Sequence, residues 1–555
     1  MRLQSLITGC PAKGAEALCI RHVADGSLSF DTYFNIFACA LWKKYTTAEG
    51  FVLRVFCRGA GKLRVVADGK VICSAEARIG ENVMPFDPGE AQAVWLEAGA
   101  GADVQGGEFI AEEADLRDVD IALDICTYRR EEYVRRNIDL IRKEIWENPE
   151  SPLNGHLAVY ISDNAATLGD IPGARVFINR NVGGSGGFAR GLMEIIDDSR
   201  ATHTVFMDDD VTLMPESLER LYAFLRAVRD KYATVPVGGA MLRLDRPCIQ
   251  HESLAIWHGL LSESLGTELD LSARENVIKN LHQQSADYSA WWFSCVPVSL
   301  AREKGLPLPI FVRMDDVEYG MRLGIPPMAL PGVCVWHEPF ERKHSAGTEY
   351  YHARNSLIVN ALRTPQVPVA RLLGRLIAGT LMRYRYVHAE MILSGVYDFL
   401  KGPGYLMNLD PQKCNGSLKK LEIMPAEDLD LAALEASDAM RDTRGSKIIS
   451  MLTLNGAILP ARGRAWVHAH INPVRAYFRK AEAINVIADT GLAFTVKRDN
   501  RRGLNLALRA LKTLGRLRRE WAVISEKWRA AEDEMVSREF WRKYLEPGEK
   551  TGVQN

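Results

Sequence analysis

Short apolar runs separated by glycine and aspartate dominate the first part of the chain. The runs FVLRVFCRG, KLRVVADG, KVICSA and AVWLEA are rich in valine, isoleucine and aromatic residues, and a glycine-rich stretch, GAGADVQGG, follows them. Such runs are typical of short β-strands joined by turns. Because two sheets of this kind bury their apolar faces against each other, we predict a β-sandwich domain over residues 1–117.

The pattern changes at Asp118, where strand-like runs begin to alternate with helical ones. The strand-like runs are DIALDICTYRR, HLAVYISDNA, ARVFINRN and HTVFMDDDV, and each leads into a polar loop. This alternation predicts an α/β domain over residues 118–355, with a Rossmann-like parallel sheet and helices on both faces. Ligands of such sheets bind beyond the carboxyl ends of the strands. Those ends carry four groups of polar residues, at 127–130, 162–164, 179–181 and 208–210.

From residue 356 to residue 555 the pattern is helical. Two long segments, RLLGRLIAGTLMRYRYVHAEMIL and GLNLALRALKTLGRLRREWAVISEKW, are amphipathic, and Lys and Arg dominate their polar faces. We predict a C-terminal helical domain that forms a homo-oligomer interface, with contact to a membrane surface as the alternative. No apolar stretch reaches the ~20 residues that span a bilayer.

The composition excludes some classes of protein. Hydrophobic residues make up 47% of the chain and charged residues 25%, and 69 Lys and Arg against 70 Asp and Glu give a net charge of -1. A nucleic acid is therefore not the expected partner, since proteins that bind it are usually basic. The ten cysteines are scattered without a Cys-x-x-Cys pair, which predicts a reducing compartment. Because the first residues lack a signal-peptide pattern, we expect a cytoplasmic protein, either free or peripheral on the inner face of the cell membrane.

The most informative motif is the acidic run VFMDDDV, in which a strand-like segment leads into Asp208, Asp209 and Asp210. Three adjacent carboxylates repel one another unless a cation compensates their charge. Mg²⁺ and Mn²⁺ prefer carboxylate oxygen and keep positions open for phosphate. The alternative is a solvated acidic turn or a helix cap before Pro215. The position at the end of a buried strand favours a metal site.

A second acidic pair, Asp315 and Asp316, follows the apolar segment LPLPIFV. A carboxylate opposite a leaving group can act as a general base and remove a hydroxyl proton during in-line attack. The same residues can cap the helix that begins there, and the two roles are compatible because one Asp can cap while the other faces a cleft.

Three further motifs carry candidate chemistry. His337 in WHEP can complete a metal shell, although a hydrogen-bonded structural histidine is the alternative and His344 and His352 compete for the role. The loop NRNVGGSGGF lets a backbone approach a ligand closely, but its spacing is not that of a dinucleotide fingerprint. Trp291 and Trp292 can stack on sugars or pack in a core, and at most one of them lines a cleft if they lie on a strand.

Taken in order, CTYRR, SDNA, NRNVGGSGGFARG, FMDDDV, WWFS, DDVEYGMR and WHEP resemble the family 2 glycosyltransferases with the GT-A fold. The resemblance is strongest to galactofuranosyltransferases that polymerise cell-wall galactan, whose layout also has an N-terminal β-sandwich and a C-terminal helical region. It implies a UDP-galactofuranose donor, a glycan or glycolipid acceptor, Mn²⁺ or Mg²⁺, and inversion at the anomeric carbon.

By motif position, the resemblance implies that Asp208, Asp210 and His337 bind the metal and that Asp316 is the general base. It places donor contacts at Thr127, Arg130, Asp163, Asn181, Asp209 and Asp315, and sugar or acceptor contacts at Trp291 and Trp292.

The chain departs from the family at TYRR, where an Asn often precedes the final Arg, and its flanks look shorter, which leaves acceptor and processivity open. A rhamnosyl- or other hexosyltransferase and a non-catalytic carbohydrate-binding protein are the alternatives. An NAD-dependent oxidoreductase does not fit, because the first strand-to-helix loop lacks glycines.

Overall fold

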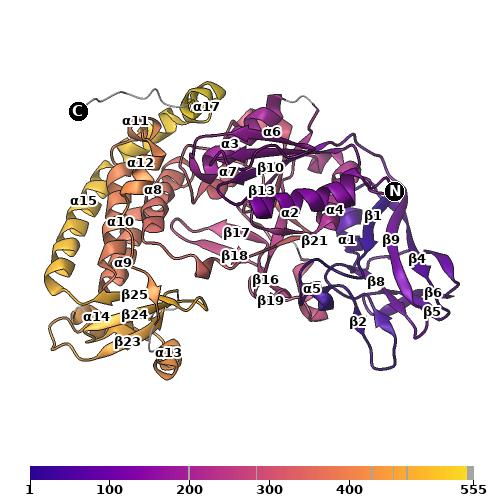
Figure 1. Cartoon of the computed structure of the whole chain (residues 1–555), viewed down its shortest axis with the longest axis horizontal. Helices are drawn as coiled ribbons and strands as arrows, with labels where there is room; N and C mark the ends of the chain where they lie inside the picture. The colour runs from indigo at the N-terminus through magenta and orange to yellow at the C-terminus, as the bar shows by residue number, and fades with distance from the viewer. Residues whose placement is uncertain (198–199, 283, 427–428, 454, 471–472, 547–555) are drawn as a thin grey trace.

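The computed structural model describes residues 1–197, 200–282, 284–426, 429–453, 455–470 and 473–546. The chain forms an arc of three parts, which Figure 1 shows from the N-terminal sheets (indigo) through a central sheet (magenta) to the C-terminal helices (orange and yellow). Among the described residues, no helix combines the length and the apolar character that crossing a bilayer requires.

The N-terminal part is a pair of facing sheets, as the alternating apolar runs predict. One sheet has the order β1-β9-β4-β7 and the other β2-β3-β8-β5-β6. Their strands are β1 Arg2–Leu6, β2 Arg21–His22, β3 Leu28–Ser29, β4 Glu49–Cys57, β5 Lys62–Ala67, β6 Lys70–Glu76, β7 Gly80–Pro85, β8 Val94–Ala98 and β9 Val104–Glu113, with helix α1 at Cys39–Tyr45. The core contains stacked rings of Phe37 and Phe109, 4.8 Å apart. Arg220 of the central part donates to the carbonyl of Phe34 at 2.8 Å, which fixes the sandwich to its neighbour.

The central part is built on one large mixed sheet with the order β12-β11-β10-β13-β20-β15-β16-β19. Its strands are β10 Ile121–Thr127, β11 Leu157–Asp163, β12 Ala174–Ile178, β13 His203–Asp208, β15 Val237–Arg243, β16 Ile249–Glu252, β19 Leu269–Asp270 and β20 Ser294–Pro297, joined at the side by β14 Thr212–Leu213 and β21 Met328–His337. The four strands from β10 to β13 are parallel, as predicted. Beyond them β20 runs antiparallel to β13 and the sheet becomes mixed.

Helices and a hairpin surround this sheet. They are α2 Glu131–Ile141, α3 Gly183–Asp197, α4 Pro215–Ala227, α5 Arg274–Asn280, α6 Val298–Lys304, α7 Asp315–Leu323 and the hairpin of β17 Leu254–Trp257 with β18 Ser262–Leu265. Helix α3 packs directly on β10 because it presents glycines: a Cβ on Gly187 would lie 2.1 Å from the Cys126 sulfur. A parallel core followed by antiparallel strands, with helices around it, is the GT-A arrangement that the resemblance implies.

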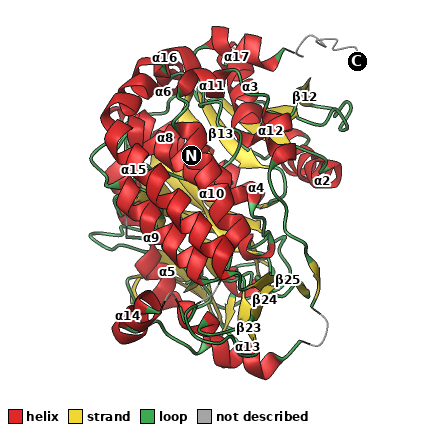
Figure 2. Ribbon diagram, turned by 90° about the vertical axis from the view of Figure 1, so that its left-hand side faces the viewer, coloured by secondary structure: helices red, strands yellow, loops and turns green. Residues whose placement is uncertain are grey.

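The C-terminal part is mainly helical, which confirms the prediction, and Figure 2 shows its long helices side by side. The helices are α8 Gly347–Leu362, α9 Val369–Met382, α10 Tyr386–Phe399, α11 Pro403–Met407, α12 Pro411–Ser417, α13 Leu431–Asp438, α14 Arg444–Leu452, α15 Asn500–Ala530, α16 Glu532–Met535 and α17 Arg538–Leu545. The expected boundary after residue 355 falls inside α8. Helix α15 exposes Leu504, Leu508 and Leu511, and the oligomer or membrane contact expected of it stays a prediction.

A small sheet in the C-terminal part was not expected. Its strands are β22 Met424–Pro425, β23 Arg464–His468, β24 Glu482–Ile487 and β25 Leu492–Lys497, in the order β22-β25-β24-β23. At the end of the described chain, α17 returns to the central part, where Trp541 donates its indole N–H to the carbonyl of Pro307 at 2.9 Å and packs in the core beside α3.

Candidate active site

The acidic run lies at the carboxyl end of β13, with Asp208 as the last strand residue and Asp209 and Asp210 in the turn that follows. His337 is the last residue of β21. The two segments meet because β14, directly after the acidic turn, pairs with β21: Thr212 lies opposite Trp336. This pairing explains how a histidine far along the chain reaches the acidic turn.

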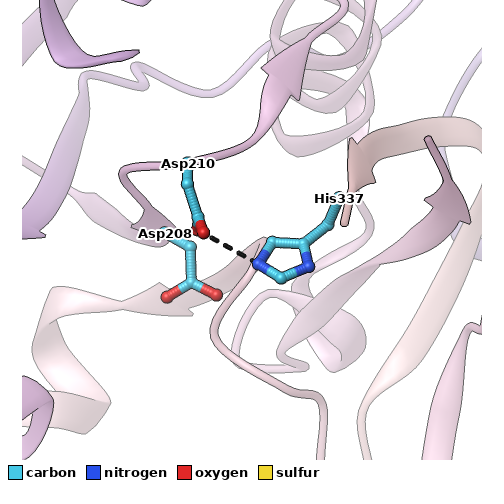
Figure 3. A group of neighbouring side chains, drawn as sticks. All are labelled: Asp208, Asp210 and His337. Carbon is cyan, nitrogen blue, oxygen red and sulfur yellow. Dashed lines mark hydrogen bonds and ion pairs between the residues drawn. The ribbon is translucent and has the colours of Figure 1, made fainter. Parts of the chain in front are cut away.

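Asp208, Asp210 and His337 form one cluster, whose candidate ligand atoms lie within 4.8 Å of one another. Figure 3 shows the imidazole directed at the two carboxylates, with His337 Nε2 3.1 Å from Asp210 Oδ1. On its other side, His337 Nδ1 lies 2.6 Å from the carbonyl oxygen of Glu338, which orients the ring. Neither His344 nor His352 belongs to this cluster in the described part of the chain, and the role of His337 as a metal ligand stays a prediction.

Burial and charge set the protonation of this cluster. Burial raises the pKa of Asp208 to about 7. For Asp210 burial acts in the same direction, but hydrogen bonds from His337 and Lys343 outweigh it and hold the pKa of that carboxyl well below its usual range. Burial alone would lower the pKa of His337, and the hydrogen bond to Asp210 with the nearby carboxylates raises it instead. Strong mutual perturbation of this kind is typical of functional sites.

Asp209, the middle residue of the run, faces the first strand of the sheet. Thr127 donates its hydroxyl to Asp209 Oδ2 at 2.7 Å, and Arg130 Nη1 lies 2.9 Å from Asp209 Oδ1. The same Arg130 nitrogen lies 2.6 Å from Asp210 Oδ2. The structure therefore brings together the predicted residues of the first and fourth strands.

The second acidic pair begins α7, after an unusual backbone turn. Phe311, Arg313 and Met314 all have positive φ, between 66° and 76°, a conformation that costs energy in non-glycine residues and is concentrated at functional sites. Helix α8 holds this turn, since Asn355 Nδ2 donates to the carbonyls of Ile310, Val312 and Arg313 at 2.8–3.1 Å. The turn thereby fixes where α7 starts.

Asp315 and Asp316 are half-buried at the start of α7. Burial raises the pKa of Asp316 to about 6, while burial and the charge of Asp316 raise the pKa of Asp315 to about 8. The charge of Asp208 also raises the pKa of Asp315, so the two acidic groups lie near each other.

Glu252 is a further buried acid near Asp316, and the sequence did not predict it as a site residue. Burial raises the pKa of Glu252, at the end of β16, to about 7, and the charge of Asp316 acts in the same direction. Tyr288 lies nearby and donates its hydroxyl to Ser262 of the hairpin at 2.7 Å. No local motif identifies Glu252, because the fold alone brings it near Asp316, 64 positions later in the chain.

Comparisons with known proteins identify relatives of this chain. Residues 13–103 match the family model of the galactofuranosyltransferase 2 N-terminal domain. Galactofuranosyltransferase GlfT2 of Mycobacterium tuberculosis (strain ATCC 25618 / H37Rv) is 29% identical over 439 residues, which cover 70% of this chain and 67% of that protein. GlfT2 of Mycolicibacterium smegmatis (strain ATCC 700084 / mc(2)155) is 25% identical over 599 aligned positions, covering 95% of this chain and 90% of that protein. The chain is a GT-A glycosyltransferase and a relative of the GlfT2 enzymes.

Solved structures resemble this glycosyltransferase only distantly. The structure of GalNAc-T7 with UDP, GalNAc and Mn²⁺ is 13% identical, with a TM-score of 0.35 over 49% of this chain and 52% of that chain. The mannosyltransferase PcManGT from Pyrobaculum calidifontis, in complex with GDP-Man and Mn²⁺, is 12% identical, with a TM-score of 0.27 over 62% of this chain and 84% of that chain.

The two tryptophans of the glycosyltransferase have different surroundings. Trp291 lies in an aromatic core with Phe188 and Phe206, at 5.0 and 4.9 Å between ring centroids, and its expected sugar contact stays a prediction. Trp292 donates to the carbonyl of Gly239 at 3.0 Å, and its ring lies 6.2 Å from that of Phe340. Since Phe340 in turn packs on His337, Trp292 lies on the same side of the enzyme as the Asp208–Asp210–His337 cluster.

Asp163 and Asn181, which are predicted to contact the nucleotide-sugar donor, hold loops in the structure. Asp163 accepts backbone N–H groups of Ala165, Thr167 and Leu168 at 2.8–2.9 Å, and Asn181 accepts the N–H of Gly183 at 3.1 Å. Both residues lie at strand ends beside the site, and their donor contacts stay predictions.

The glycine-rich loop and the start of α3 also have a packing role. A Cβ on Gly183 would lie 2.0 Å from the Phe311 carbonyl oxygen, and one on Gly191 would lie 1.9 Å from Asp124 Oδ1. These glycines let α3 approach β10 and the turn before α7, and the expected approach of a ligand to the loop stays a prediction.

Proposed function

We propose that the enzyme transfers galactofuranose from UDP-galactofuranose to a hydroxyl of an acceptor glycan or glycolipid, with inversion at the anomeric carbon. The observation that carries the proposal is the convergence of two acidic groups on one site: the Asp208–Asp210–His337 cluster and the start of α7. The choice of sugar rests on the GlfT2 relatives.

The proposed cofactor is Mn²⁺ or Mg²⁺, held by Asp208, Asp210 and His337. Two carboxylates and an imidazole with one oriented nitrogen are a donor set that suits such ions. When bound there, the ion would supply positive charge for the diphosphate that leaves with uridine.

Asp316 is the proposed general base. Burial raises its pKa to about 6, so at neutral pH it is mostly ionised and still takes up a proton more readily than an ordinary carboxylate. In the proposed step, the acceptor hydroxyl loses its proton to a carboxylate oxygen of Asp316 while its oxygen attacks the anomeric carbon. The bond from that carbon to the diphosphate oxygen breaks, and UDP leaves with the bonding electron pair. Asp315, with a pKa of about 8, stays largely protonated at neutral pH and can donate a hydrogen bond.

On the donor side, Arg130, Thr127 and Asp209 form a connected group between the acidic turn and the end of β10. We propose that this group, with the loops held by Asp163 and Asn181, receives the uridine diphosphate.

The test is release of UDP from UDP-galactofuranose with and without Mn²⁺, over a set of short acceptor glycans. We expect transfer that requires both the ion and an acceptor, and NMR of the product should show the inverted anomeric configuration. UDP-galactopyranose and the nucleotide-activated rhamnose serve as matched donors. Faster transfer from either one would replace galactofuranose in the proposal and leave the metal site and the base in place.

A further inference from the structure

The carboxylate of Asp210 has three nitrogen partners in this structure, and two of them are cations on one oxygen. Arg130 Nη1 lies 2.6 Å and Lys343 Nζ 2.9 Å from the same oxygen, Asp210 Oδ2, while His337 Nε2 lies 3.1 Å from Oδ1. A divalent ion on this carboxylate would compete with both cations for its lone pairs and would repel them. At least one of the two must therefore leave when an ion binds.

The surroundings indicate which cation leaves. Arg130 has a second carboxylate, since its Nη1 lies 2.9 Å from Asp209 Oδ1 and so remains paired after Asp210 is lost. Lys343 forms no other ion pair in the described part of the chain. Its side chain is 41% exposed, whereas that of Asp210 is 9% exposed, so the lysine reaches the site from the open side.

The loop that carries Lys343 is anchored at the rim of the site. The preceding residue, Arg342, pairs with Asp489 in the turn between β24 and β25, at 2.8 Å from Nε to Oδ1, and also with Glu338 at 3.3 Å. The small C-terminal sheet thus holds the backbone next to the acidic turn. A lysine has a flexible four-carbon stem, so its ammonium group can change partner while the loop stays in place.

We propose that Lys343 is an exchangeable cation. In the metal-free enzyme it neutralises Asp210, and when the ion and the nucleotide bind it moves to the diphosphate of the donor. The inference rests on the proposed function and adds a residue to it, one that couples the two ligands, because each then affects the affinity for the other through the same ammonium group.

The exchange predicts opposite effects of one substitution on two affinities. In Lys343→Met, Mn²⁺ without nucleotide should bind about threefold more tightly, the size expected for loss of a partly exposed ion pair that competes with it. UDP in saturating Mn²⁺ should bind about tenfold more weakly, because a charge-assisted hydrogen bond to phosphate is lost. A residue that only supports the fold would weaken both.

The measurements are a Mn²⁺ titration followed by electron paramagnetic resonance of the free ion, and calorimetric binding of UDP at saturating Mn²⁺. Lys343→Arg should keep UDP binding within about twofold of wild type, since it retains the charge. Lys497→Met, on the exposed edge of β25, is the matched control and should change neither affinity.

The outcomes separate the inference from the proposed function. Wild-type protein that binds no Mn²⁺ would overturn both. If the wild-type and Lys343→Met proteins bind Mn²⁺ and UDP equally well, or if the variant loses both affinities, the exchange is wrong and the metal site stands.

Discussion

The two acidic clusters of the site differ in what surrounds them. Asp210 in the turn after β13 is paired with Arg130, His337 and Lys343. Asp315 and Asp316, at the start of α7, form no ion pair in the part of the chain that the structure describes, and their pKa values are raised to about 8 and about 6. The surroundings thus suit the carboxylate of Asp210 to a cation, and those of Asp315 and Asp316 to a proton. The neighbouring elements decide which, because His337 at the end of β21, Arg130 before α2 and Lys343 after β21 bring nitrogen groups to Asp210.

Loss of a proposed metal ligand in the first cluster should have the largest effect on turnover. Asp208→Ala removes one of three proposed metal ligands, and we expect the kcat of UDP release to fall about a thousandfold or more, because the leaving diphosphate loses its counter-charge. Steady-state kinetics at saturating Mn²⁺ measures this, and Asp170→Ala, on an exposed loop, is the control. Turnover near the wild-type level in Asp208→Ala would place the metal elsewhere.

A substitution in the second cluster should slow the chemical step and leave binding of the nucleotide-sugar donor unchanged. We expect Asp316→Asn to lower kcat about 10²–10⁴-fold, the contribution of a general base, with the affinity for UDP and Mn²⁺ kept. Asp315→Asn is the matched variant. Because Asp315 is largely protonated at neutral pH, an amide imitates it, and its kcat should fall by about tenfold at most. If the two variants exchanged these effects, Asp315 would be the base.

The pH dependence sharpens the same distinction. The raised pKa of Asp316 means that the base is protonated, and inactive, below about pH 6. With Mn²⁺ saturating, kcat/KM should therefore fall about tenfold per pH unit on the acid side of that value. Glu252 also titrates near pH 7, so the assignment requires the acid limb to disappear in Asp316→Asn. If the acid limb of the kcat/KM profile persists in Asp316→Asn, it reports the titration of another residue and Asp316 is not the base.

A third buried carboxylate, Asp124 on β10, has neither a cation nor a hydrogen-bond donor among the described residues, and burial raises its pKa well above the usual range. The native state keeps this proton after the unfolded chain has lost it, so the wild type loses stability as pH rises above about 4.

Asp124→Asn cannot ionise, and its free energy of unfolding relative to wild type should therefore increase with pH, by up to about 1.4 kcal/mol per unit. Urea unfolding at pH 5 and pH 8 measures the difference, and we expect the smallest effect on turnover of all these variants. A stability difference that does not change with pH would mean that Asp124 is ionised in the fold.

Much of the site follows from local patterns in the sequence. Asp208, Thr127 and Asp163 end buried parallel strands, and the strand pattern places such ends at one edge of the sheet. His337 was also identified, although its place beside Asp210 depends on the pairing of β14 with β21, which no local pattern reveals.

What the sequence did not reveal depends on long-range packing. Trp291 looks like a sugar platform, yet its ring packs in a core with residues of α3 and the central sheet. Lys343 and Glu252 have ordinary neighbours in the sequence, and only the contacts made by distant strands give them a role. The small C-terminal sheet was missed because its short strands lie among strongly helical segments.

The return of α17 to the central part has a consequence for how the enzyme is made. Arg538 pairs with Asp197, 341 positions earlier in the chain, and Trp541 fills the core beside the glycine-rich start of α3. While a ribosome is still extending the C-terminal helices, the central sheet lacks one wall of its interior. Completion of the transferase domain must therefore wait for the last helix to be synthesised, and a truncated product would leave apolar surface beside α3 exposed to chaperones and proteases.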